Sequence, residues 1–140
     1  MFRFLLFTFF VGLILSCQEL PPEAYLIDKY KITGQIDIKP EIKDQCQEGV
    51  LFLIVRKGAN PQPLAVKRFR NFSFPKDFSI SPADVLMPQR ANEFDGQLII
   101  MARVSKSGTP FPQKGDCESD AKLVEAGSRG VKITINKVVK

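Results

Sequence analysis

Val50-Leu51-Phe52-Leu53-Ile54-Val55 is an uninterrupted apolar run that begins directly after Gly49. A short run that is apolar at every position is typical of a strand buried on both of its faces. Residues 97–104 contain a similar apolar run, from Leu98 to Ala102. The chain therefore predicts two central strands, around which the rest of a sheet is expected to assemble.

Two other segments alternate between apolar and polar residues, which is the pattern of a strand with one buried face. The first runs from Tyr30 to Ile38 and is ended by Pro40, and the second runs from Val131 to Val139. Shorter apolar patterns bounded by turn residues predict two more strands, at residues 64–69 and 74–80.

The connecting segments complete the pattern. Pro75 cannot donate a backbone hydrogen bond, so it places the strand at residues 74–80 at a sheet edge or a bulge. Residues 81–84 are expected to form one short helical turn, whereas residues 105–130 show no long helical period. Short strands separated by turn signals predict an all-β fold over residues 30–140, an antiparallel β-sandwich of about six to eight strands.

The amino-acid composition limits the classes of function that the chain can have. The chain has 140 residues, enough for one domain, and it contains no His. The lack of His excludes Ser-His and Cys-His nucleophilic pairs, His-ligated zinc and haem held by a protein imidazole. We therefore expect a non-enzymatic binding or structural module without a metal or cofactor. The net charge of +5 comes from scattered basic residues, which does not indicate nucleic acid binding.

The N-terminus has a different character from the rest of the chain. Arg3 is the only charge in residues 1–17, and an uncharged run extends from Phe4 to Leu15. This run has the length of a signal-peptide core, and it is shorter than the roughly 20 apolar residues that span a bilayer. It ends in Ile14-Leu15-Ser16-Cys17, which looks like a bacterial lipobox.

The lipobox predicts a lipoprotein signal peptide at residues 1–16 and a lipid on the thiol of Cys17, which would anchor the chain in a lipid bilayer. Residues 17–29 are then the lipidated cysteine and an extended tether stiffened by Pro21-Pro22. The expected location is the bacterial cell envelope, facing the periplasm, and Gln18 in place of Asp favours the outer membrane. The alternatives are an ordinary secretory signal with a coincidental cysteine, or a short signal anchor.

Lipidation of Cys17 leaves Cys46 and Cys117 as one intramolecular pair in a compartment outside the reducing cytosol. A structural disulfide between them is the main expectation. A redox-active pair is disfavoured because the two cysteines are far apart in sequence and lack a C-x-x-C arrangement, and free thiols remain a third alternative.

The candidate site residues lie in and around one predicted loop. Ser105-Lys106-Ser107-Gly108 ends a central strand and, with Asp116 further along, forms a candidate interaction loop for a carboxylate or a haem propionate. A simple turn explains the same residues and is favoured. Arg68 and Arg103 are expected to be structural charges that pair with a carboxylate such as Asp95 or Asp116.

Several short motifs, taken in order, resemble the C-terminal periplasmic domain of the c-type cytochrome biogenesis protein CycH, and they cover residues 32 to 138. The motifs are Ile32-Thr33-Gly34, Pro63-Leu64-Ala65-Val66-Lys67-Arg68, Met87-Pro88, Phe94-Asp95, Ala102-Arg103-Val104-Ser105-Lys106-Ser107-Gly108, Pro112-Gln113-Lys114-Gly115-Asp116 and Gly130-Val131-Lys132. The resemblance implies an immunoglobulin-like (Ig-like) fold.

The same resemblance implies a role in c-type cytochrome maturation, as an accessory or docking module for haem attachment. Haem-lyase components or apocytochrome c are the partners that it implies. The tetratricopeptide repeats that hold the apocytochrome tail in the family protein have no counterpart in these residues. The alternative is a generic envelope lipoprotein with a structural or adhesive Ig-like domain.

Overall fold

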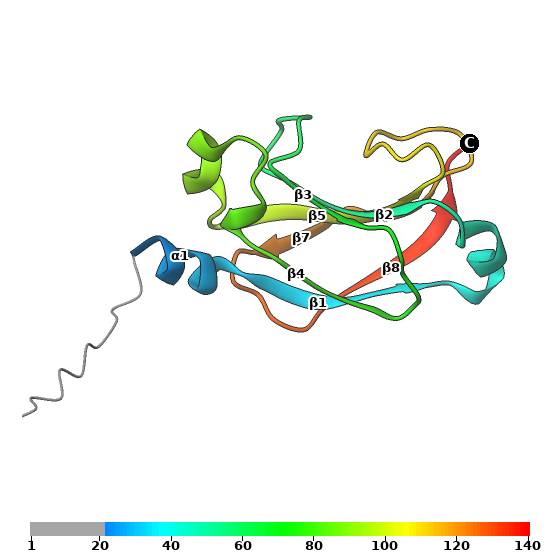
Figure 1. Ribbon diagram of the computed structural model, residues 1–140, viewed down its shortest axis with the longest axis horizontal. Coiled ribbons are helices and arrows are strands. Elements are labelled where there is room, and N and C mark those ends of the chain that lie inside the picture. Colours follow the sequence, from blue (N-terminus) through cyan, green and yellow to red (C-terminus); the bar gives the residue numbers. More distant parts are fainter. Residues whose placement is uncertain (1–21) are drawn as a thin grey trace, which may run out of the picture.

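The computed structural model describes residues 22–140, which form eight strands, one α-helix and three short 3-10 helices (Figure 1). The expected signal peptide at residues 1–16 and the expected lipidation site Cys17 lie outside the described residues. In chain order the elements are α1 (Pro22–Tyr30), β1 (Ile32–Ile38), η1 (Pro40–Cys46), β2 (Val50–Arg56), β3 (Ala65–Phe69), β4 (Lys76–Ile80), η2 (Pro82–Asp84), η3 (Pro88–Glu93), β5 (Gln97–Ser105), β6 (Cys117–Ser119), β7 (Lys122–Glu125) and β8 (Val131–Val138).

The strands form one continuous sheet in the order β3-β2-β5-β6-β8-β1-β4, with β7 paired to β5. Figure 1 shows the sheet folded over on itself, with β2, β3 and β5 above and β1, β4 and β8 below. The three-residue strand β6 joins the two layers because it pairs with both β5 and β8. The sheet therefore wraps around its core almost like a barrel.

The prediction of an all-β fold is correct, but a purely antiparallel sandwich is wrong in one respect. β1 and β8 run parallel, with Gly34 opposite Val131 and Ile38 opposite Ile135. An alternating pattern of apolar residues specifies which face of a strand is buried and not the direction of its neighbour, so the sequence could not distinguish the two arrangements.

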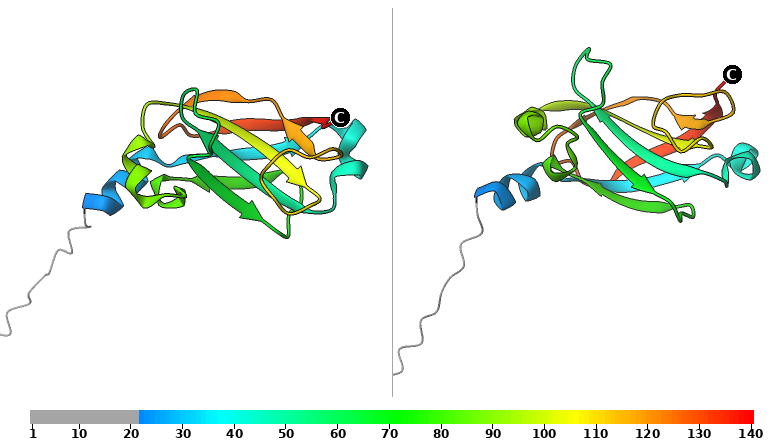
Figure 2. Two further views of the ribbon diagram at one scale, coloured as in Figure 1. Left: turned by 90° about the horizontal axis from the view of Figure 1, so that it is seen from above. Right: turned by 45° about the horizontal axis from the view of Figure 1, so that its top comes forward.

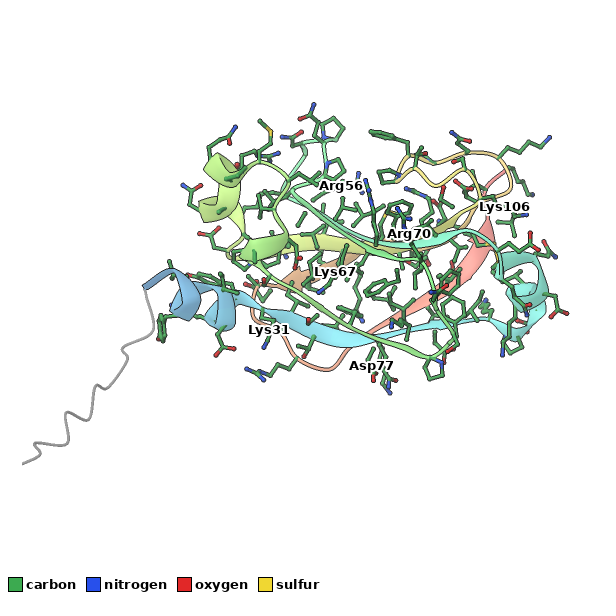
Figure 3. The ribbon with its side chains drawn as sticks, viewed as in Figure 1. Lys31, Arg56, Lys67, Arg70, Asp77 and Lys106 are labelled. Carbon is green, nitrogen blue, oxygen red and sulfur yellow. A yellow bond between two sulfur atoms is a disulfide. The ribbon has the colours of Figure 1, made fainter. Side chains whose placement is uncertain are left out.

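The edge strands β3 and β4 face each other across a seam that backbone pairing leaves open. Lys67 points from β3 into this seam, and its Nζ donates to the carbonyl oxygen of Ser79 on β4 at 2.7 Å (Figure 3). Lys76 of β4 lies over the ring of Phe69 on β3, 5.0 Å from its centre. An inward-pointing lysine protects a sheet edge from pairing with another chain.

The predicted central strand β2 contributes to the core on both faces. Leu51, Leu53 and Val55 are fully buried in the main core, between the two layers. Phe52 and Ile54 point the other way and form a second, small cluster with Met101 of β5. Strand β2 is therefore covered on the outside of the molecule as well as on the inside.

The first and last strands approach each other closely at Gly34. A Cβ atom at this position would collide with the carbonyl oxygen of Val131. Glycine is required here for space, because the backbone of β8 occupies the place of a side chain.

Cys46, at the end of η1, and Cys117, at the start of β6, form a disulfide with a sequence separation of 71 residues. Both residues are buried, with exposed fractions of 0% and 1%. The bond ties the loop after β1 to the strand that joins the two layers, which is the place of a structural disulfide.

The end of the expected tether has a different structure. Pro22–Tyr30 form helix α1, where an extended chain was expected to continue to residue 29. A proline is well tolerated in the first turn of a helix, since the amide group that it lacks would have no partner there. None of the helices in residues 22–140 is long and apolar enough to cross a bilayer.

Candidate functional site

The candidate site lies on the outer face of the upper layer, which we define as the side of β3, β2, β5 and β6 that points away from the main core. Strand pairing places a row of residues across this face, because directly opposite residues share a side of the sheet. The row consists of Arg68, Phe52, Arg103, Glu118 and Lys137. The next row consists of Val66, Ile54 and Met101.

Arg103 is at the centre of the first row and is only 6% exposed. Its Nη2 lies 2.8 Å from Oε2 of Glu118, its Nε donates to the same oxygen, and its Nη1 donates to the carbonyl oxygen of Pro110. Arg103 was expected to pair with a carboxylate such as Asp95 or Asp116, and it does pair with a carboxylate, although with neither of these two. Glu118 is its partner because β6 brings that carboxylate directly opposite, which only the strand register reveals.

Arg68 also has a partner that the sequence did not predict. Its guanidinium lies over the ring of Phe52, 5.7 Å from the centre, and the residue is exposed. Within residues 22–140 no carboxylate lies within ion-pair distance of Arg68. Its aromatic contact covers the apolar cluster from outside, so Arg68 packs against the sheet and does not form the expected ion pair.

The candidate interaction loop is held as a well-defined turn. Asp116 is 1% exposed, and its carboxylate accepts the amide of Lys106 at 3.2 Å and that of Gln113 at 2.9 Å. The hydroxyl of Ser105 accepts the amide of Thr109 at 3.2 Å and lies 3.1 Å from that of Ser107.

Gly108 completes this turn with a φ of 79°, a left-handed conformation that favours glycine. The geometry agrees with the turn that the sequence favoured. Ser105 and Asp116 are occupied in shaping the loop and are not presented to a ligand.

The ordered loop forms one wall of a groove of 360 Å³ on the outer face. The floor contains Ile54 and Met101, beside Arg103 and Glu118. The walls are two proline-containing loops, with residues Pro61, Pro63, Pro110, Phe111 and Pro112. Phe111 is 65% exposed, so an aromatic ring stands at the edge of the groove with no cover from the described residues.

Charged groups line one end of the groove. Lys137 lies 3.1 Å from Oδ1 of Asp120 and 3.9 Å from Oε1 of Glu118. Hydrogen bonds from Asn136 and Lys137 hold the pKa of Asp120 below its ordinary value. This end of the groove therefore presents a lysine held between two carboxylates.

The groove has the chemistry of a binding surface. Ser119 carries the one hydroxyl group that the described residues place in its lining; the hydroxyl oxygen accepts the amide of Ala102 at 2.9 Å, and the hydroxyl donates to the carbonyl oxygen of Asp120 at 3.1 Å. A hydroxyl used in this way is not an activated nucleophile. Among residues 22–140 there is no cluster of three or more metal-ligating side chains.

Comparison with known proteins identifies the family. The family model described as the Ig-like domain of cytochrome c-type biogenesis protein H matches residues 32–136. The chain belongs to this family. The matched residues begin at the first residue of β1 and end within β8, so they include the loop that forms the wall of the groove and every groove-lining residue except Lys137.

Two similar proteins differ in how much of their own length matches this chain. An uncharacterized protein of Aquifex aeolicus is 35% identical over 137 residues, covering 90% of this chain and 89% of that protein. The cytochrome c-type biogenesis protein CycH of Pseudomonas aeruginosa is 37% identical over 79 residues. That match covers 55% of this chain and 19% of CycH, so the similarity concerns a small part of the larger protein. No solved structure matches this chain.

The sequence indicated the loop, Arg68 and Arg103 as candidates, but it did not reveal the groove beside Arg103. The proline pairs at residues 61 and 63 and at residues 110 and 112 were visible in the sequence. Only the pairing of β2 with β5 brings these two loops to the same face. Nothing in the sequence around Glu118, apart from its charge, indicated that it belongs to the site.

Proposed function

We propose that this protein is a membrane-anchored lipoprotein of the bacterial envelope that faces the periplasm and serves c-type cytochrome maturation as a non-enzymatic docking module. Lipidation of Cys17 would provide the anchor, with the outer membrane favoured. The match of residues 32–136 to the CycH Ig-like family carries the maturation role. Envelope location follows from that role and from the lipobox pattern at residues 14–17.

The outer-face groove is the surface through which we propose that docking occurs. Its floor is a sheet, its walls are held by the disulfide-linked strand β6 and by Asp116, and Phe111 projects beside it. Exposed aromatic residues on rigid supports are typical anchors of protein interfaces. Haem-lyase components or apocytochrome c are the proposed partners.

A photo-crosslinking amino acid placed at Phe111 in living cells of the source bacterium tests this proposal. The matched control position is Thr134, an exposed residue in the opposite layer, on β8. We expect crosslinks from position 111 to proteins of the haem-attachment machinery or to apocytochrome c, identified by mass spectrometry, and few or none of these from position 134.

Two results would argue against the proposal. If crosslinks from position 111 contain only unrelated envelope proteins, the chain fits better a structural or adhesive lipoprotein. If positions 111 and 134 yield the same products in the same amounts, the groove is not the docking surface.

A further inference from the structure

A second exposed apolar surface lies at the end of the molecule where α1 begins. It consists of Tyr25 and Leu26 on α1, and Leu86 and Met87 just before η3. Their exposed fractions are 65%, 46%, 56% and 44%. We call these four residues the apolar end. Large exposed side chains gathered in this way mark an interaction site more often than scattered ones do.

The two segments of the apolar end lie at the same end of the molecule (Figures 1 and 2). A cavity of 320 Å³ lies between α1 and the segment that contains η2 and η3, and it is lined mainly by apolar side chains. Its lining includes Leu26 and Tyr30 from the helix, and Pro82, Ala91 and Phe94 from the other side. Figures 1 and 2 show α1 and this segment together at the same end of the molecule in all three views.

Two ion pairs lie beside the apolar end. Arg90 and Glu93 form an ion pair at 2.6 Å, and Lys31 and Asp28 form another at 3.4 Å. The hydrogen bond between Arg90 and Glu93 raises the pKa of Arg90 and lowers the pKa of Glu93, so that both remain charged and paired. Paired charges approach a medium of low dielectric constant at a smaller desolvation cost than single ones.

The position of the apolar end in the chain indicates that the lipid bilayer is its partner. Cys17 precedes Pro22, the first residue of α1, by five residues, a span of at most about 18 Å for any chain conformation. A lipid on Cys17 would therefore keep α1 within that distance of the bilayer surface. Figure 3 places Lys106, in the loop that forms one wall of the outer-face groove, at the other end of the molecule from Lys31, and places Arg56, another residue of the groove lining, between them.

We propose that the apolar end rests on the lipid bilayer, with Tyr25, Leu26, Leu86 and Met87 at the boundary between headgroups and acyl chains. This inference rests on the proposed lipid anchor and adds an orientation to it. Aromatic and aliphatic side chains at this depth give a lipidated protein a second membrane contact, which fixes its orientation on the bilayer. The domain is then oriented with its α1 end toward the bilayer and with the groove toward the periplasm.

The absence of Trp from the chain allows a direct test. Met87→Trp and Phe111→Trp each introduce one tryptophan, at two exposed positions on opposite ends. The full lipidated chain is reconstituted into phosphatidylethanolamine–phosphatidylglycerol vesicles whose acyl chains carry bromine, which quenches tryptophan on contact. We expect the Met87→Trp variant to lose about half or more of its fluorescence and the Phe111→Trp variant less than about a tenth.

Equal quenching of the two variants in lipidated protein would overturn the orientation and leave the anchor intact. Adding Leu86→Asp to the Met87→Trp variant should reduce the quenching, since a carboxylate resists entry into the acyl region. If mass spectrometry finds no lipid on Cys17, the anchor fails, and the same variants are added to the vesicles as unanchored full chains. Stronger quenching of Met87→Trp would then still support the apolar end as a membrane contact, and its absence would overturn it.

Discussion

Arg103 connects the wall of the groove to its floor, because its guanidinium binds the carboxylate of Glu118 at 2.8 Å and also donates to the carbonyl oxygen of Pro110. Glu118 belongs to β6, whereas Pro110 belongs to the loop that carries Phe111. One nearly buried side chain thus fixes the position of an exposed aromatic ring relative to the sheet.

Replacing Arg103 should therefore loosen the wall of the groove. Arg103→Met removes the charge that compensates Glu118, and we expect a loss of about 2–3 kcal/mol in the free energy of unfolding, measured with urea. Amide hydrogen exchange in residues 106–112 should also become faster. Arg68→Met is the matched control on the same row; it removes one exposed cation–π contact and should cost about 1 kcal/mol or less. Equal losses in the two variants would contradict the role assigned to Arg103.

The disulfide should contribute strongly to stability because it closes a long loop. With Cys46 and Cys117 separated by 71 residues, the chain-entropy model gives about 4 kcal/mol. Cys46→Ala combined with Cys117→Ala should lower the urea midpoint, and reduction of the wild-type protein should lower it by a similar amount. A midpoint that reductant leaves unchanged would show that the bond is absent or does not stabilise the fold.

The parallel pairing of β1 with β8 can be tested at Gly34. Gly34→Ala places a methyl group against the carbonyl of Val131, and we expect a loss of about 3 kcal/mol or more, or a failure to fold. Gly58→Ala is the control: nothing lies within 4 Å of its Cβ, and its φ of +59° should cost only about 1 kcal/mol. If Gly34→Ala were the milder of the two, strands β1 and β8 could not lie as close together as described.

Asp120 should make stability depend on pH in the acid range. Its pKa is lowered in the folded state by hydrogen bonds from Asn136 and Lys137, so its contribution is complete above its unfolded pKa, about 3.9. That contribution is lost as the pH falls through the lower folded pKa. The difference in urea midpoint between the wild type and Asp120→Asn should therefore be larger at pH 7 than at pH 3. A difference that grows in acid would reverse the sign and contradict these contacts.

The strands were largely predictable from the sequence because their patterns are local. The apolar run at residues 50–55 became β2, the alternating segment after Tyr30 became β1, and Pro75 directly precedes the edge strand β4. Strands β6 and β7 were missed, since three and four residues are too few for a recognisable period. Their place in the sheet depends on β5 and β8, which are distant in sequence.

The candidate site was predictable only in part. Arg103 was recognised from its position within a central strand and the loop at residues 105–108 from its position at the end of that strand, but the partner of Arg103 was not. Glu118 becomes its partner through strand register, and Asp116 is used by backbone amides of its own loop. Contacts of this kind depend on tertiary pairing, which residue patterns along one segment do not contain.

The most direct test of the account is the amount of covalently bound haem in the c-type cytochromes of the source bacterium, measured by haem staining of gels. We expect deletion of this protein to lower that amount. The wild-type chain and Thr134→Asp should restore it, and Phe111→Asp at the groove should not. Normal haem staining in the deletion strain, with or without a defect of the envelope, would contradict a role in cytochrome maturation.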